Sequence, residues 1–531
     1  MLNGIYSLRL RATDRYGQTA VTSIAGVVDK NFKVGQFQVA FSDLNVPMAG
    51  LPIEVVRSYD SRDKRVGDFG VGWQLGIRSA RVEKTGVLGF GWHQTATSGF
   101  TPTYCLEPSR PHKVAITFGD GKVFKFRAST AIHCQQLAPI TATQLTFTPE
   151  PGTHATLEST TATDVVVAAQ GSVPGPVHLL NQNNPDIFNT GSFRLTLAEG
   201  TVYLIDQRSG VSSVRDPYGN TLTIGAGGIV HSSGQSISFT RDSAGRITHI
   251  TDPRGNVQSY SYDPNGDLAS YTDREQNTTS FSYNSSHHLV SITDARGVNL
   301  LTNEYDPGGR LIGQSDAFNK SIIYDHDVIG RVETISDRLG QQTRYEYDQS
   351  GNVLRQTDAR GGVKTFTYDA FDNVLTETNA LGKTITYTYD AAGNRATIVD
   401  PGNNVTTFTY NAARQPLTIT DARGHVTTNS YDATGTNLLT TTDQLGHTTT
   451  FTYSVFTGQR TTMKDALDHQ TRYAYDAANR LQSETDALGH VTTYGYDANG
   501  NRTAQTVTRI NSQGPLETIR TTYTYDKLNR L

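Results

Sequence analysis

The sequence is poor in the residues that several classes of protein require. It has two cysteines and three methionines among 531 residues, and 18% of its residues are charged, against about 25% in typical soluble domains. Cys105 and Cys134 could pair, but two cysteines are not a disulfide framework and do not assign a redox compartment. A net charge of −4 offers no basic surface to nucleic acid or to an anionic membrane.

Long apolar runs are also missing. No stretch approaches the roughly 18 apolar residues of a membrane helix. The opening residues MLNGIYSLRLRATDRYG lack the charged start and apolar core of a signal peptide. The chain is instead rich in Gly, with 49 residues, and Tyr, with 26. This composition disfavours a helical bundle and is typical of short strands joined by tight turns.

A Tyr-Asp pair, or its equivalent, recurs between residues 241 and 526. Nine of the thirteen intervals between these pairs are 21 residues long, so this part of the chain is a repeat array. The pairs begin at Arg241, Tyr262, Tyr283, Tyr305, His326, Tyr347, Tyr368, Tyr389, Tyr410, Tyr431, Tyr453, Tyr475, Tyr496 and Tyr525. A second recurring position, occupied by Asp or Asn, follows halfway through each unit, at Asp252, Asp273, Asp294, Asp316, Asp337, Asp358, Asn379, Asp400, Asp421, Asp443, Asp465 and Asp486.

The Asp of the Tyr-Asp pair and the Asp at this second position both begin the pattern D-x-x-G, which predicts a tight turn. Asp suits the first position because its carboxylate accepts nearby backbone N–H groups, and Gly three residues later supplies a positive φ. Each unit is therefore expected to be two strands and two turns. The residues predicted to have this structural role are Tyr262, Asp263, Gly266, Tyr305, Asp306, Gly309, Tyr347, Asp348, Gly351, Tyr368, Asp369, Tyr389, Asp390, Gly393, Tyr431, Asp432, Gly435, Tyr475, Asp476, Tyr496, Asp497 and Gly500.

Apolar and polar residues alternate between the turns, which predicts an all-β array of about 28 short antiparallel strands. At about 4.8 Å per strand such a ribbon is on the order of 130 Å long, and natural twist prevents it from staying flat. The position two residues after the turn Gly is usually apolar but becomes Arg395, Asn437 and Arg502 in three units. Because a dry core tolerates Arg poorly, we expect a coiled shell around a lumen rather than a two-sheet sandwich.

These motifs resemble the RHS/YD-repeat family, whose pattern is Y-D-x-x-G-R-L-x-x-x-T-D. YDPGGRL at 305–311 and YDANGNR at 496–502 match it closely. GLPIEVVRSYDSR at 50–62 and GDFGVGWQL at 67–75 resemble the segment that precedes such repeats. The resemblance implies a hollow β-cocoon, which in toxin members of the family encloses a C-terminal effector.

The resemblance implies a non-enzymatic structural shell that encapsulates or presents a C-terminal effector or toxin domain for delivery to other cells. Its partners would be that effector and upstream domains, with secretion-apparatus components or surface glycans as further candidates. The full-length protein would then be secreted or at the cell surface. Because the family also contains wall-associated proteins and teneurins, a cell-surface adhesion or carbohydrate-binding protein is the alternative. No cofactor, nucleic-acid partner or membrane span is expected.

Five segments are predicted along the chain. Residues 1–26 are expected to be the remnant of an upstream immunoglobulin-like β-domain, and 27–127 an RHS-type, β-rich entry domain. Residues 128–192 are expected to be an irregular insertion rich in Thr, Ala and Pro. Degenerate repeats follow at 193–235 and regular repeats at 236–531. Because neither end resembles a natural terminus, the chain is expected to be a fragment.

Three groups of residues could be functional sites, and each has a simpler interpretation. His425, His447, His469 and His490 occupy one repeat position and could bind metal, but Asn or Lys fills that position elsewhere. His287 and His288 lie in a turn where Gly is usual. The Asp rows could bind Ca²⁺, and the aromatic rows could stack on sugars, but turn capping and packing within the sheet explain them. No catalytic, cofactor or metal site is predicted.

Overall fold

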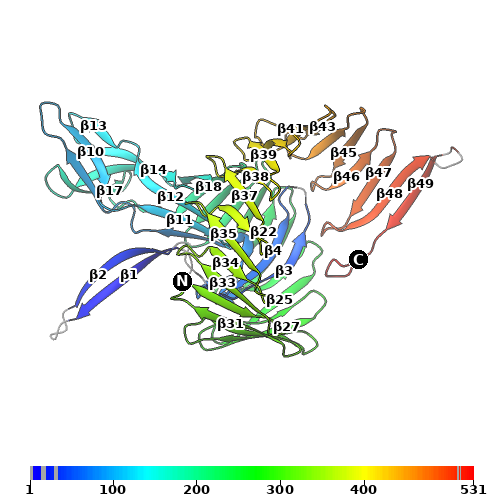
Figure 1. Cartoon of the computed structure of the whole chain (residues 1–531), viewed down its shortest axis with the longest axis horizontal. Helices are drawn as coiled ribbons and strands as arrows, with labels where there is room; N and C mark the ends of the chain where they lie inside the picture. The colour runs from blue at the N-terminus through cyan, green and yellow to red at the C-terminus, as the bar shows by residue number, and fades with distance from the viewer. Residues whose placement is uncertain (1–3, 14–18, 29–33, 49, 511–513, 515) are drawn as a thin grey trace. The chain divides into compact units, whose positions relative to one another are not determined.

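The computed structural model describes residues 4–13, 19–28, 34–48, 50–510, 514 and 516–531 (Figure 1). In this part of the chain the regular structure is 49 strands and one 3₁₀ turn, η1 (Gly76–Arg78), so the all-β prediction is confirmed. The chain forms two compact units. Unit 1 comprises Met1–Asn31, Arg78–Ala198 and Val202–Ser212, and unit 2 comprises Phe32–Ile77, Glu199–Thr201 and Ser213–Leu531.

Unit 1 consists of antiparallel strands that form two sheets sharing one strand. Its strands are β1 (Gly4–Thr13), β2 (Thr19–Val28), β8 (Ala80–Lys84), β9 (Trp92–Ala96), β10 (Thr103–Pro108), β11 (Lys113–Phe118), β12 (Val123–Thr130), β13 (Cys134–Gln136), β14 (Ala142–Pro149), β15 (Ala155–Ser159), β16 (Asp164–Ala169), β17 (Gly175–Asn181), β18 (Ser192–Leu197) and β19 (Val202–Asp206). One sheet runs β8-β11-β12-β14-β15-β18-β19, and the other runs β13-β10-β9-β17-β16-β14. β14 therefore joins the two sheets, while β1 and β2 pair only with each other.

The segment 128–192 is regular sheet and not an irregular insertion. It contains β13 to β17, and its apolar side chains alternate between buried and exposed, as in β17, where Val177 and Leu179 are buried. Its strands lack the 21-residue period, which is why a search for repeats misses them. The assignment of residues 1–26 to an immunoglobulin-like domain stays a prediction, and residues 1–3 and 14–18 lie outside the described residues.

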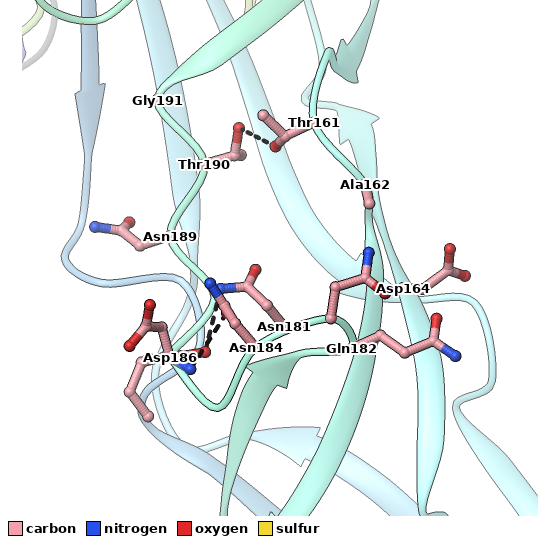
Figure 2. Close-up of a pocket in the computed structure, with 12 residues that line it drawn as sticks. Thr161, Ala162, Asp164, Asn181, Gln182, Asn184, Asp186, Asn189, Thr190 and Gly191 are labelled. Atoms are coloured by element: carbon pink, nitrogen blue, oxygen red, sulfur yellow. Dashed lines mark hydrogen bonds between the residues drawn. The ribbon is translucent and has the colours of Figure 1, made fainter.

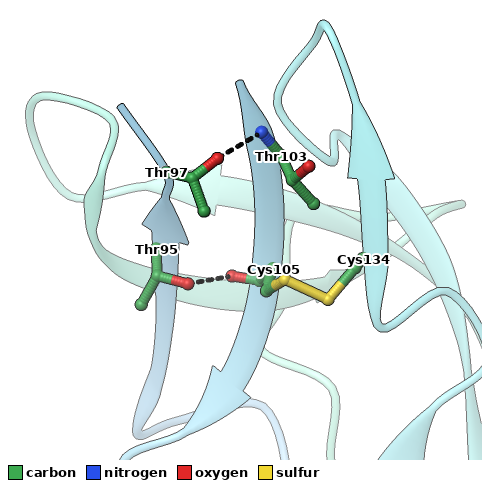
Figure 3. The surroundings of a disulfide bond; sticks show 5 residues. All are labelled: Thr95, Thr97, Thr103, Cys105 and Cys134. Atoms are coloured by element: carbon green, nitrogen blue, oxygen red, sulfur yellow. Dashed lines mark hydrogen bonds between the residues drawn. A yellow bond between two sulfur atoms is a disulfide. The ribbon is translucent and has the colours of Figure 1, made fainter. Parts of the chain in front are cut away.

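A disulfide joins two strands of unit 1 (Figure 3). Cys105 on β10 faces Cys134 on β13, and their sulfur atoms are bonded. Beside them, the Thr95 hydroxyl donates to the Cys105 carbonyl at 3.3 Å. The bridge therefore ties the short strand β13 to the sheet at a point where only three residue pairs connect the strands.

Unit 2 contains the repeat array and five short N-terminal strands. These five are β3 (Gln38–Val46), β4 (Ile53–Asp60), β5 (Val66–Gly67), β6 (Gly70–Val71) and β7 (Trp73–Leu75). The strand β20 (Gly210–Arg215) crosses from unit 1 into unit 2. The first strands of the array are β21 (Thr221–Gly225), β22 (Gly228–His231), β23 (Ser236–Arg241), β24 (Ile247–Thr251), β25 (Val257–Tyr262), β26 (Leu268–Thr272), β27 (Thr278–Tyr283), β28 (Leu289–Thr293), β29 (Asn299–Tyr305), β30 (Leu311–Asp316), β31 (Ser321–Asp327) and β32 (Val332–Ser336).

The array continues to the end of the chain, and each strand pairs antiparallel with the next. Its later strands are β33 (Gln342–Tyr347), β34 (Val353–Thr357), β35 (Val363–Tyr368), β36 (Val374–Thr378), β37 (Thr384–Tyr389), β38 (Arg395–Val399), β39 (Val405–Tyr410), β40 (Pro416–Thr420), β41 (Val426–Tyr431), β42 (Leu438–Thr442), β43 (Thr448–Tyr453), β44 (Arg460–Lys464), β45 (Gln470–Tyr475), β46 (Leu481–Thr485), β47 (Val491–Tyr496), β48 (Arg502–Ile510) and β49 (Leu516–Thr522).

The array in unit 2 coils back on itself, as the length of the ribbon requires. Turns of its first strands contact turns of its last strands, although 218 to 259 residues separate them. The contacts join Asn499 Nδ2 to Asp252 Oδ2 at 2.8 Å, Asn479 Nδ2 to Asn220 Oδ1 at 3.1 Å, and the Lys527 N–H to Glu275 Oε1 at 2.7 Å. Polar groups along the edges of the ribbon thus connect its first turns to its last turns.

Candidate functional site

From Tyr262 to Tyr496, each Tyr-Asp motif ends one strand and opens the turn to the next, whereas Tyr525 follows β49 and lies in no strand. In a representative unit, Asp390 Oδ1 accepts the N–H groups of Ala392 at 2.9 Å and Asn394 at 2.8 Å. The structure places all the Tyr residues of the predicted set at strand ends and the Asp residues at the first turn position. The glycines lie in the left-handed region, with φ between +74° and +90°: Gly266, Gly309, Gly351, Gly393, Gly435 and Gly500.

These local bonds shift the acidity of the turn aspartates. Burial alone would raise the pKa of the Asp390 carboxyl, but hydrogen bonds from Asn394 hold that pKa below its usual value. At Asp400, hydrogen bonds from the side chain and N–H of Asn404 lower the pKa. Each of these two carboxylates is thus engaged by hydrogen bonds within its own turn.

The Tyr of the motif has a role that the sequence analysis missed. Its hydroxyl donates to a backbone carbonyl fifteen residues earlier, on the preceding strand, as from Tyr389 to Val374 and from Tyr368 to Val353, both at 2.8 Å. The pairing register shifts by one residue immediately before the Tyr, so the Tyr sits at a β-bulge. The spacing is fifteen residues in most units but sixteen from Tyr305 to Leu289, and the Tyr347 hydroxyl donates to the Glu333 carboxylate instead.

The Tyr side chains define one face of the sheet, which we call the tyrosine face. Over β24 to β30 this face is buried, with Leu268 0% and Tyr260 4% exposed. The strands β3, β4 and β7 cover it: the Tyr59 hydroxyl donates to the His287 carbonyl and accepts the Leu289 N–H, both at 2.9 Å. The N-terminal strands of unit 2 thus pack against repeats more than 200 residues later in the chain.

A buried arginine lies at the centre of this covered region. Arg57 is 1% exposed and forms two hydrogen bonds with Asp43, at 2.8 and 3.1 Å. Its guanidinium carbon lies 4.8–5.7 Å from five aromatic ring centres, those of Phe41, Trp73, Tyr260, Tyr271 and Phe281. Burial raises the pKa of Tyr260, whose hydroxyl also donates to Asp43 at 2.9 Å. Because both members of this ion pair are buried, removing one of them would leave an uncompensated charge in the interior.

Over the later strands, β33 to β48, the tyrosine face is not buried. Aromatic side chains continue there but are half-buried, as at Tyr387 and Tyr473. Arg395 and Arg502 are exposed, and their guanidinium carbons lie 4.5 and 5.5 Å from the ring centres of Tyr387 and Tyr494. The position two residues after the turn Gly is therefore apolar where β3, β4 and β7 cover the tyrosine face. Where these strands do not cover the face, the same position can be Arg.

The opposite face is lined with hydroxyl groups, and we call it the threonine face. Neighbouring strands pair their Thr side chains across it, as between Thr388 and Thr397 at 2.7 Å and between Thr409 and Thr418 at 2.7 Å. These side chains are exposed or half-buried. The two faces of the sheet therefore differ in chemistry: aromatic rings line the tyrosine face, whereas hydroxyls line the threonine face, with arginines such as Arg472 among them.

The histidines singled out in the sequence lie in separate turns. His425, His447, His469 and His490 each direct Nδ1 to the Asp of their own turn, at 2.9–3.0 Å. His287 occupies a turn position with φ +59° and contacts Asp267, while His288 is buried against Tyr305. In the described residues, no group of three or more His, Cys, Asp or Glu side chains could hold a metal ion.

Comparisons with known proteins identify the repeats. The RHS Repeat family model matches residues 262–298, 326–363, 347–384, 368–405, 396–426, 457–491 and 475–509. A sequence search of curated proteins found no significant match. No helix in the described ranges is long and apolar enough to cross a membrane.

Several solved structures of toxin complexes are similar to this chain at low identity. The TcdB2-TccC3 structure without its hypervariable C-terminal region is 13% identical, with a TM-score of 0.40, over 81% of this chain and 27% of that chain. The Tc holotoxin pore of Photorhabdus luminescens is 12% identical, with a TM-score of 0.34, over 80% of this chain and 31% of that chain. This chain therefore spans about a quarter to a third of the length of these two structures.

Proposed function

This chain carries RHS repeats within residues 262–509, and from that premise we propose that its repeat sheet is a non-enzymatic shell that encloses a C-terminal effector for delivery. The proposal requires an effector polypeptide C-terminal to residue 531. The proposal also gives that protein a secreted or cell-surface location. The disulfide between Cys105 and Cys134 supports this location, because disulfides persist in oxidising compartments.

The observation that carries the proposal is the change along the tyrosine face. β3, β4 and β7 bury this face at Tyr260 and Leu268, whereas the same positions from β33 to β48 are half-buried or exposed. Aromatic rings and arginines together form the kind of surface that is enriched in protein interfaces. A polypeptide held against the open part would complete the burial that the N-terminal strands provide for the early repeats.

Proteolysis of the full-length gene product tests the shell. We expect the polypeptide after residue 531 to resist a protease at a concentration that digests the same polypeptide expressed alone. Arg460 lies on the tyrosine face like Arg395, with its guanidinium carbon 4.7 Å from the ring centre of Tyr473. The double variant Arg395→Glu with Arg460→Glu should shorten this protection because it reverses the charge of the lining.

The matched control is Thr397→Glu with Thr462→Glu, on the same strands β38 and β44 but on the threonine face, and it should leave the protection unchanged. Equal protease sensitivity of the enclosed and isolated polypeptides would overturn the proposal. So would a full-length gene in which no polypeptide follows residue 531.

A further inference from the structure

Unit 1 contains an open cleft that the shell does not require (Figure 2). Two adjoining cavities, of about 490 and 540 Å³, share Asn189 and Gly191 in their walls. The loop between β17 and β18 forms one wall, with the loop between β15 and β16 and the start of β16 opposite it. We call the two cavities together the amide cleft, because six of the side chains that line them are amides: Asn181, Gln182, Asn183, Asn184, Asn189 and Gln207.

Three of these amides are available to a ligand. Gln182, Asn183 and Gln207 are exposed, and their side chains make no hydrogen bond to any described residue. The neighbouring loop is held in place, since Asn181 Nδ2 donates to the Asp186 carbonyl at 3.2 Å. A planar amide presents a donor and an acceptor side by side, which matches two adjacent hydroxyls of a sugar ring. The cleft thus offers several such pairs from one loop.

The charges of the cleft are close to balanced. Asp164, Asp186 and Asp206 line it together with Lys84 and Arg208. This set gives a strongly anionic or cationic polymer no net attraction. A neutral ligand that is recognised by hydrogen bonds, with charged groups as additional donors and acceptors, fits the lining better.

Lys84 supplies donors at the junction of the two cavities. Its Nζ donates to Asn189 Oδ1 at 2.8 Å and to the Thr190 carbonyl at 2.7 Å. An ammonium has three N–H donors, so one remains after these two bonds. Burial lowers the pKa of Lys84 to about 8, and the group is therefore mainly protonated at neutral pH. The remaining N–H can donate to a ligand hydroxyl, because Lys84 lines the second cavity.

From the free amides, the balanced charge and the Lys84 donor, we propose that the amide cleft binds a neutral oligosaccharide. This binding function is additional to the proposed shell function, because the cleft lies within unit 1 whereas the repeats lie in unit 2. The binding site also differs from the aromatic rows of the repeats, which lie in unit 2.

Calorimetric titration of the full chain with chitotetraose, cellotetraose and maltotetraose tests the proposal. We expect at least one of these neutral probes to bind with a Kd below about 1 mM. The double variant Gln182→Leu with Asn183→Leu should weaken that binding by about tenfold or more, as expected for the loss of hydrogen-bonding partners in a site that recognises hydroxyls. Gln170→Leu, an exposed amide outside the cleft, is the matched control and should bind as the unmodified chain does.

Because the substituted side chains are exposed and make no hydrogen bond to any described residue, the variants should keep the circular dichroism spectrum of the parent. The proposal is overturned if none of the three probes binds. It is also overturned if the double variant binds as tightly as the control, or if tetragalacturonate, an anionic probe, binds more tightly than every neutral one.

Discussion

Removing Arg57 should destabilise unit 2 more than removing any exposed arginine of the repeats. In Arg57→Leu, Asp43 stays buried and keeps only the Tyr260 hydroxyl as a side-chain partner. Breaking a buried ion pair from one side costs about 3–5 kcal/mol, because an uncompensated charge is left behind. We expect a loss in this range, since both the guanidinium and the carboxylate are almost fully inaccessible, with 1% and 2% of their side chains exposed.

The double variant Arg57→Leu with Asp43→Leu separates the charge from the packing. Replacing both partners of a buried pair with apolar residues is often neutral or stabilising. The double variant should therefore be more stable than Arg57→Leu alone. The aromatic rings around the site remain in both variants, so the difference between them reports the unpaired carboxylate.

Trp73 provides the readout, because its ring centre lies 4.8 Å from the Arg57 guanidinium carbon. The chain has two tryptophans, and the other, Trp92, is in unit 1, so a Trp92→Phe background makes the fluorescence specific to unit 2. Urea titration of each variant then gives the free energy of unfolding of this unit.

Arg296→Leu is the control, since Arg296 pairs with Asp294 but is 79% exposed. Exposed pairs contribute about 0–1 kcal/mol. If Arg57→Leu costs no more than Arg296→Leu, or if the double variant is less stable than Arg57→Leu alone, the reasoning is refuted.

Three further predictions concern the repeats and the disulfide. Tyr389→Phe should cost about 0.5–1.5 kcal/mol in urea unfolding. Tyr387→Phe should cost less, because the Tyr387 hydroxyl lies on the same face but makes no hydrogen bond to any described residue; equal costs would contradict the role of the carbonyl bond. Replacing Cys105 and Cys134 with Ser opens a loop whose ends are 29 residues apart and should lower the stability of unit 1 by about 2–4 kcal/mol, and dithiothreitol should then have no further effect on its melting temperature. Because the pKa of Asp400 is lowered in the folded state, its contribution is present above the unfolded pKa of about 3.9 and is lost as pH falls through the folded value. Asp400→Asn should therefore reduce the loss of melting temperature below pH 4, and an unchanged acid profile would refute this.

The repeats could be read from the sequence because their structure is local. A D-x-x-G turn such as the one at Asp390 is specified by four adjacent residues, and Tyr389 follows from the same motif. The covering of the tyrosine face could not be read in this way, because Tyr59 bonds to the backbone at His287 and Leu289, 228 and 230 residues away. No local pattern encodes such a contact.

The amide cleft was missed for a different reason. Its loop follows Asn181 and contains Pro, Asn and Asp, a composition that indicates a turn but not which walls will meet around it. Arg395 could be interpreted in part from the sequence. An Arg at a usually apolar position indicated that this face of the sheet is not a dry core, but its contact with Tyr387 could be seen only in the structure.

The contacts between the first and last turns of the array have a consequence for how such chains can evolve. The contacting residues, such as Asp252 and Asn499, belong to turns that recur with every 21-residue unit. Adding or removing one whole unit between them would bring an equivalent turn to the same place. The number of units in the coil could then change one at a time, but the side chains at the contact would change too, because the position of Asn499 is held by Ala392 and Ala478 in other units. Gene duplication within the array would therefore need a compensating substitution at the contacting turn.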